Sequence, residues 1–137
     1  MRRRRPSPSN AIDVSRYDHW LMTKHIRWSE LPVENVNPLF DRQFVVGDKV
    51  MVARIVMRKG CLVPEHSHHN EQISQILSGS LRFSMEGKEI VLKAGEFLFI
   101  PPNVPHAAVA LEDTTAIDTF TPPREDWING TDQYLRK

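Results

Sequence analysis

The chain has 137 residues, of which 40% are hydrophobic, and its formal net charge is +1 at pH 7. Without the four arginines at positions 2–5 it would carry 14 basic and 17 acidic residues, so no basic face is expected for binding nucleic acid. No apolar run reaches the length of a membrane span. The single cysteine, Cys61, cannot form a disulfide within the chain and favours a reducing, cytoplasmic location.

Three segments are predicted from the local composition and from the positions of the prolines. Residues 1–10 form a basic, disordered tail, because no apolar segment follows the arginines as it would in a secretory signal. Residues 11–39 form an N-terminal arm, since their pattern is irregular and is interrupted by Pro32 and Pro38. Residues 40–137 form a β-rich barrel domain with a C-terminal tail.

The β-rich part consists of short runs separated by turn signals. Gly47-Asp48 and Glu86-Gly87 are typical of tight hairpins, and the run LRFSM at 81–85 alternates apolar and polar residues. Many short strands without a long amphipathic helix predict an antiparallel sandwich or barrel. The tail after residue 123 is expected to form a short helix or turn that packs on the outside.

Histidines dominate the stretch HSHHNEQ at 66–72. Residues two apart in a strand point to the same side, so His66 and His68 share a face while His69 points away. Gln72 is also at even spacing and offers an oxygen ligand. His106 follows the rigid sequence PPNVP and could complete a metal site from a neighbouring strand.

These residues carry a resemblance to the cupins. The cupin motif G-x5-H-x-H-x3-4-E-x6-G matches residues 60–79, with Gln72 in the place of the glutamate. The motif G-x5-P-x-G-x2-H-x3-N matches residues 95–110, where Asn103 replaces a glycine and Ala110 the final asparagine. Asparagine is the substitute that best tolerates a positive φ. The resemblance covers about residues 40–120 and implies an all-β, double-stranded β-helix (jelly-roll) barrel and a homodimer.

One divalent transition metal is expected at this site, bound by His66, His68, Gln72 and His106. Glu71 is the alternative oxygen ligand, but its odd spacing should turn it outward. Imidazole ligands suit several metals, and the resemblance implies Zn, Ni, Mn or Fe. With four neutral ligands the charge of the ion stays uncompensated, which makes it a stronger Lewis acid.

A second group of residues lies in the sequence DTFTPPREDW. Asp118 and Phe120 share a face of a predicted strand, and Arg124 follows a stiff Pro-Pro pair. In a pocket, Asp118 would move a proton, Phe120 would stack on the substrate, and Arg124 would bind its carboxylate bidentately. The alternative is an Asp118–Arg124 ion pair that ties down the tail, with Phe120 in the core.

The combined pattern is similar to the cupins of pectin and alginate breakdown that convert 4,5-unsaturated uronates to linear keto sugars. The resemblance implies a small anionic substrate, acid/base catalysis by Asp118 and carboxylate binding by Arg124. Two alternatives remain open at this point. One is an iron-dependent dioxygenase, and the other is a ligand-binding or sensor barrel without catalysis.

Overall fold

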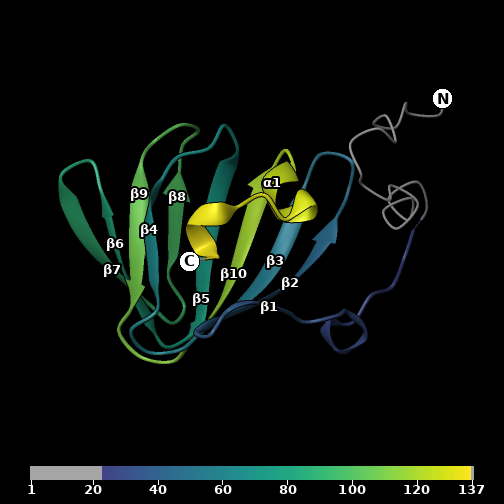
Figure 1. Cartoon of the computed structure of the whole chain (residues 1–137), viewed down its shortest axis with the longest axis horizontal. Coiled ribbons are helices and arrows are strands. Elements are labelled where there is room, and N and C mark those ends of the chain that lie inside the picture. Colours follow the sequence, from purple (N-terminus) through teal and green to yellow (C-terminus); the bar gives the residue numbers. More distant parts are fainter. Residues whose placement is uncertain (1–22, 137) are drawn as a thin grey trace.

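A computed structural model describes residues 23–136, which form two antiparallel sheets facing each other (Figure 1). The larger sheet has the order β1-β2-β3-β10-β5-β8 and the smaller one β4-β9-β6-β7. The predicted all-β barrel is therefore confirmed. The strands are β1 (Glu34–Asn37), β2 (Phe40–Val46), β3 (Met51–Met57), β4 (Leu62–His66), β5 (Glu71–Ser78), β6 (Ser80–Met85), β7 (Lys88–Lys93), β8 (Phe97–Ile100), β9 (His106–Ala110) and β10 (Thr114–Thr121).

The core lies between the two sheets and follows from the alternation along the strands. Every second residue of β3 is buried, and in β6 the predicted apolar face points inward while Arg82 and Ser84 face out. A strand whose residues alternate between apolar and polar places its apolar side chains in the core and its polar side chains on the surface. The inward residues of these two strands are Met51, Ala53, Ile55, Met57, Leu81, Phe83 and Met85.

Three turns between strands show why particular residues are needed. Glu86 and Gly87 have φ values of 52° and 72°, and they join β6 to β7 in the predicted tight hairpin. Asn103, which stands where the cupin motif has glycine, has φ of 67°, as predicted. Gly79 has no room for a side chain, because a Cβ there would lie 2.4 Å from the Asp113 carbonyl oxygen.

The N-terminal part of the described chain adds an edge to the larger sheet. A 3-10 turn, η3 (Trp28–Glu30), precedes β1, which pairs with β2. The predicted tail at 1–10 and the arm up to residue 22 lie outside the described residues. Within residues 23–136, no helix has the length and apolar character needed to cross a membrane.

The C-terminal segment does not pack on the outside as expected. It forms helix α1 (Glu125–Asn129) and a 3-10 turn, η4 (Gln133–Leu135), and lies across the space between the two sheets (Figure 1). Trp127 and Leu135 are only 4% and 2% exposed. These apolar side chains gain more by covering the open end of the barrel than by lying on its surface.

Ion pairs hold this segment in place. Asp132 accepts a hydrogen bond of 2.6 Å from Arg42, and both side chains are fully buried. Arg136 donates to Asp132 at 2.9 Å and to Glu34 at 2.7 Å, so the segment is tied to both β1 and β2. The buried Asp132–Arg42 pair matters most for stability, since removing one partner would leave the other charge buried and unpaired, which is strongly destabilising.

The variant Asp132→Ala is expected to lower the free energy of unfolding by about 3 kcal/mol, because the buried Arg42 would keep Glu34 as its one carboxylate partner. Urea denaturation measures this loss. Glu30→Gln, which removes an exposed pair with Arg27, should change stability by less than about 1 kcal/mol. Equal effects of the two variants would show that the segment is held by its apolar contacts alone.

Candidate functional site

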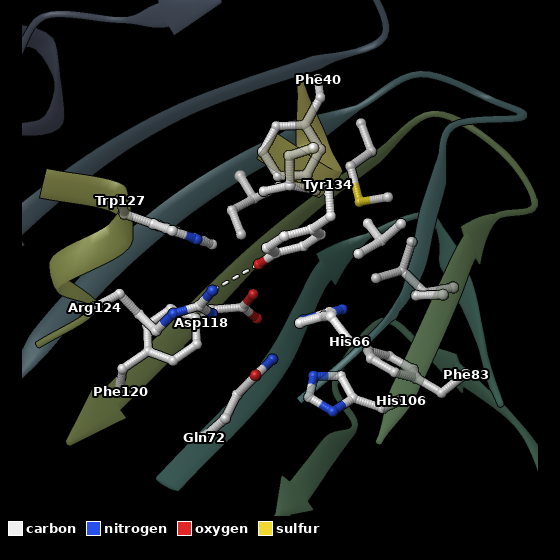
Figure 2. Close-up of a pocket in the computed structure, with 16 residues that line it drawn as sticks. Phe40, His66, Gln72, Phe83, His106, Asp118, Phe120, Arg124, Trp127 and Tyr134 are labelled. Carbon is white, nitrogen blue, oxygen red and sulfur yellow. Dashed lines mark hydrogen bonds between the residues drawn. The ribbon is translucent and has the colours of Figure 1, made fainter. Parts of the chain in front are cut away.

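A cavity of about 50 Å³ lies between the two sheets and beneath the C-terminal segment (Figure 2). Its wall is apolar except for one cluster of polar side chains. The structure brings together in this wall most of the residues expected from the sequence. The polar lining residues are His66, Gln72, His106, Asp118, Arg124 and Tyr134.

Three histidines converge from two strands and a loop. His66 ends β4 and His106 begins β9, where they are direct neighbours across the sheet. The strand ends at His66, so His68 lies in a loop rather than in the strand we expected. That loop is held by a 2.7 Å hydrogen bond from the Asn103 N–H to the His68 carbonyl. The ligand nitrogens of the three imidazoles all lie within 4.8 Å of one another.

Backbone carbonyls set the orientation of all three rings. In His66 and His106 the Nδ1 that faces a carbonyl carries the single hydrogen of the neutral ring, so the Nε2 of each keeps a free lone pair. Within the described chain, His106 Nε2 is buried without any hydrogen-bond partner. The Nδ1 atoms contact these carbonyl oxygens: that of His66 the Pro64 carbonyl at 2.8 Å, that of His68 the Asn70 carbonyl at 3.1 Å, and that of His106 the Val104 carbonyl at 2.8 Å.

Gln72 joins the histidines through its side-chain oxygen. Its Nε2 donates to Ser74 Oγ at 2.9 Å, and Ser74 in turn hydrogen-bonds Asp118, which turns the Gln72 oxygen toward His68. Gln72 Oε1 lies 3.0 Å from His68 Nε2. A neutral imidazole has one N–H, so His68 cannot donate both to the Asn70 carbonyl and to Gln72 Oε1. With the hydrogen on Nδ1, a cation between Nε2 and Oε1 would bind both lone pairs. Ligand atoms bound to one ion at about 2.1 Å lie about 3.0–3.4 Å apart, so the donor set fits a metal.

The neighbouring Glu71 is exposed, whereas Gln72 is 5% exposed and lines the cavity. This placement agrees with the parity argument from the sequence. His69 is exposed as well and does not reach the cluster. The residues that could hold a divalent ion are therefore His66, His68, His106 and Gln72, with no acidic ligand among them.

Burial keeps the imidazoles in the form that a metal needs. It lowers the pKa of His66 to about 4 and that of His68 to about 3, and the positive charges of Arg124 and of the other imidazoles add to this effect. The pKa of His106 is lowered for the same reason. All three rings are neutral at pH 7, as ligands must be.

Asp118 is half-buried in the same cavity, on the strand next to Gln72. Burial raises the pKa of its carboxyl to about 6, against the opposing effects of a Ser74 hydrogen bond and the Arg124 charge. A carboxyl with a pKa near neutrality can both accept and return a proton at working pH. This is the property that an acid/base group requires.

Arg124 is 2% exposed and pairs with Asp126, not with Asp118. Its Nε donates to Asp126 at 2.9 Å, and its Nη2 donates to Asp126 at 2.8 Å and to the Tyr134 hydroxyl at 2.6 Å. The ion pair that ties down the tail thus has a different carboxylate from the one considered in the sequence. Because Nε and Nη2 are engaged in this way, only Nη1 of Arg124 is left to bind a substrate carboxylate, and the bidentate contact expected from the sequence is not available.

Phe120 forms a wall behind this arginine. It is 1% exposed, and its ring centroid lies 5.1 Å from the guanidinium carbon of Arg124 and 5.0 Å from the Trp127 ring. The ring also meets His68 edge-on at 5.8 Å. Phe120 therefore fixes the positions of its neighbours and presents little free surface for stacking.

Two further residues of the site were not predicted. Asn70 is buried, and its side chain donates to the carbonyls of Pro122 and Pro123 while its own carbonyl holds His68. Its place inside the histidine-rich stretch at 66–72 was the one feature of the sequence that could have indicated a role in the site. Tyr134 stacks on the His66 ring at 4.3 Å and 20°, and nothing in the sequence of the tail pointed to that contact.

Comparisons with known proteins agree with this geometry. A family model described as a cupin domain matches residues 53–119. The structure of an RmlC-like cupin from Shewanella frigidimarina is 32% identical with a TM-score of 0.71, over 77% of this chain and 96% of that one. This chain therefore belongs to the cupins, as the motifs predicted.

The similarity extends to one kind of cupin in particular. The pectin degradation protein KdgF of Dickeya dadantii (strain 3937) is 29% identical over 110 residues, which are 78% of this chain and 100% of KdgF. The structure of KdgF from Halomonas sp. is 28% identical with a TM-score of 0.73, over 77% of this chain and 99% of that one. The predicted resemblance to pectin-degradation cupins is thus confirmed in sequence and in structure.

Removal of single ligands should identify the metal site. His106→Ala is expected to lower the affinity for Zn²⁺ or Ni²⁺ by more than about 100-fold, since even an outer-shell partner is worth about 10–100-fold. Gln72→Ala should lower it by at least about tenfold. Plasma mass spectrometry and competition with a chelator measure both. Glu71→Ala is the matched control and should leave the affinity unchanged; a larger loss there than in Gln72→Ala would reassign the oxygen ligand.

Metal affinity should depend weakly on pH around neutrality. Because the pKa values of His66 and His68 are lowered to about 4 and about 3, these two rings stay deprotonated as the pH falls from 7 to 5, and the lowered pKa of His106 acts in the same direction. We expect less than about a tenfold loss of affinity between pH 7 and pH 5, and a steep loss below about pH 4. Calorimetric titration at each pH tests this, and a loss above about 100-fold by pH 5 would show that the rings titrate near 6.5.

Proposed function

We propose that the protein is a metal-dependent cupin enzyme that opens the ring of a 4,5-unsaturated uronate and yields the linear keto sugar acid. One observation carries the proposal. A cluster of imidazole lone pairs, a carboxyl with a pKa near 6 and a buried arginine line the same cavity. The similarity to KdgF, a pectin degradation protein, supports the same substrate class.

His66, His68, His106 and Gln72 would hold the ion. A divalent ion on four neutral ligands acts as a Lewis acid that polarises sugar oxygens. Zn, Ni, Mn and Fe all bind imidazole ligands, so these four residues do not determine which of the metals is bound. The hydrogen bond from Gln72 Nε2 to Ser74 would keep the Gln72 oxygen directed toward the histidines.

Asp118 would move the proton. Its carboxylate takes the hydrogen of the anomeric hydroxyl as the bond between C1 and the ring oxygen breaks, which gives an aldehyde at C1 and an enolate at C5. The same carboxyl then returns the proton to C4, and the keto group forms at C5. Nothing is oxidised or reduced, and a pKa of about 6 allows both transfers near pH 7.

Arg124 would hold the C6 carboxylate through its Nη1 group, since Asp126 and Tyr134 already engage Nε and Nη2. Asp126 fixes the plane of the guanidinium, so the remaining donor has a defined direction. Phe120, packed against this arginine, would keep it from shifting and would exclude water from the carboxylate.

The remaining parts of the proposal concern assembly and location. The outer face of the larger sheet exposes a set of apolar side chains on two neighbouring strands, which would suit a homodimer. The free, buried Cys61 is in keeping with a cytoplasmic protein. The exposed residues of that face are Ile73, Leu77, Phe97 and Phe99.

The test is turnover of a 4,5-unsaturated monouronate, followed by proton NMR as the vinylic signal is lost. The metal-loaded wild type should consume it, and Asp118→Asn should lower kcat by at least about 100-fold because it removes the acid/base group. Metal content should stay the same in this variant. Asp113→Asn, a change in the exposed turn after β9, should behave like wild type.

Several results would contradict the proposal. An Asp118→Asn variant with full kcat would remove the assigned acid/base group. A wild type that binds its metal but leaves the unsaturated uronate intact would exclude the reaction. Oxygen consumption by an iron-loaded protein would favour a dioxygenase, and binding of sugar acids without turnover would favour a sensor.

A further inference from the structure

The hydroxyl of Tyr134 has a hydrogen that no contact described so far uses. Its oxygen accepts the 2.6 Å hydrogen bond from Arg124 Nη2, because a guanidinium can only donate (Figure 2). The hydroxyl hydrogen is therefore directed elsewhere. Tyr134 lines the cavity together with Asp118 and His66, so a group bound there is within its reach.

The position of the Tyr134 side chain is fixed by its ring and by the residues on either side of it. The Tyr134 ring stacks on His66 at 4.3 Å, with an angle of 20° between the ring planes. The next residue, Leu135, is buried, and Asp132 anchors the turn through its buried pair with Arg42. A phenol held in this way loses little entropy when it binds a ligand, as a preorganised donor should.

The donors of Arg124 and Tyr134 are adjacent and match one chemical pattern. A carboxylate and an oxygen on its α-carbon lie side by side, and in a 4,5-unsaturated uronate that α-oxygen is the ring oxygen. It is also the atom that leaves C1 and gains negative charge during ring opening. A hydrogen bond from Arg124 polarises the phenol and makes its own O–H a stronger donor.

We propose that Tyr134 is a substrate-contacting residue of the site: its O–H donates to the ring oxygen of a uronate whose carboxylate is held by Arg124. The proposal rests on the proposed function for the identity of the substrate. It makes the C-terminal segment a part of the active site, and the ligand class is a carboxylate with an ether or hydroxyl oxygen on the adjacent carbon.

The test compares Tyr134→Phe, which keeps the ring and its stacking on His66, with wild type. For the unsaturated uronate, kcat should fall about 100-fold with an unchanged metal content, the size expected for loss of one donor to a developing oxyanion. A second readout does not depend on turnover. Methoxyacetate and butyrate have the same shape, but only methoxyacetate has the α-oxygen, and calorimetry on the metal-loaded protein gives the affinity for each.

Wild type should prefer methoxyacetate, and Tyr134→Phe should reduce that preference about fivefold, the value of one hydrogen bond of about 1 kcal/mol. Arg136→Gln is the control, because it loosens the segment but keeps the hydroxyl. This control should keep the preference. An equal loss in Arg136→Gln, an equal preference in wild type and Tyr134→Phe, or no preference in wild type would each overturn the assignment.

The two proposals can fail separately. A wild type that leaves the unsaturated uronate intact but shows a Tyr134-dependent preference for methoxyacetate would remove the proposed reaction and keep the role of Tyr134. Full ring-opening activity in Tyr134→Phe, with no change in the preference, would remove the role of Tyr134 and keep the reaction.

Discussion

Three imidazoles can aim their lone pairs at one region only because the other nitrogen of each ring is held by a backbone carbonyl. The Asn70 contact extends this constraint, since its carbonyl holds His68 while its side chain holds the loop before Arg124. The loop that carries His68 and the loop that carries Arg124 are thus one hydrogen-bonded unit. Outer contacts of this kind set the geometry of metal sites as much as the ligands do.

A second constraint acts from the C-terminal side. The barrel is open at the end where the polar cluster lies, and the segment with α1 and η4 closes it with apolar side chains. The remaining cavity of about 50 Å³ has room for a few water molecules rather than for a sugar ring. Apolar side chains around the cavity would therefore have to move to admit a sugar ring, while the buried Asp132–Arg42 pair and the half-buried Arg136–Glu34 contact hold the segment in place.

Local chemistry explains what could be predicted from the sequence. Turn residues such as Glu86-Gly87, the alternation in β6 and the spacing of His66, His68 and His106 each reflect short-range rules, and the structure agrees with them. The parity argument also placed Gln72 inside and Glu71 outside, although His68 lies beyond the end of its strand. The motifs were specific enough to indicate the family.

Long-range pairing explains what could not be predicted. Asp126 lies two residues from Arg124, but only the fold shows that it, rather than Asp118, takes the guanidinium. Tyr134 meets His66 across 68 positions in the chain, and Asp132 meets Arg42 across 90. Nothing in a single sequence distinguishes such a tail from one that lies on the surface, because its apolar residues are few and its partners are remote.

The closeness of the C-terminal segment to the histidine cluster also bears on how the protein is best produced. A polyhistidine tag added at the C-terminus would begin directly after Lys137, only three residues past the tyrosine that stacks on His66. Imidazoles tethered by a short flexible linker reach an effective concentration of about millimolar. They would compete with the histidine cluster for a divalent ion. Metal content is therefore best measured on a protein from which such a tag has been removed.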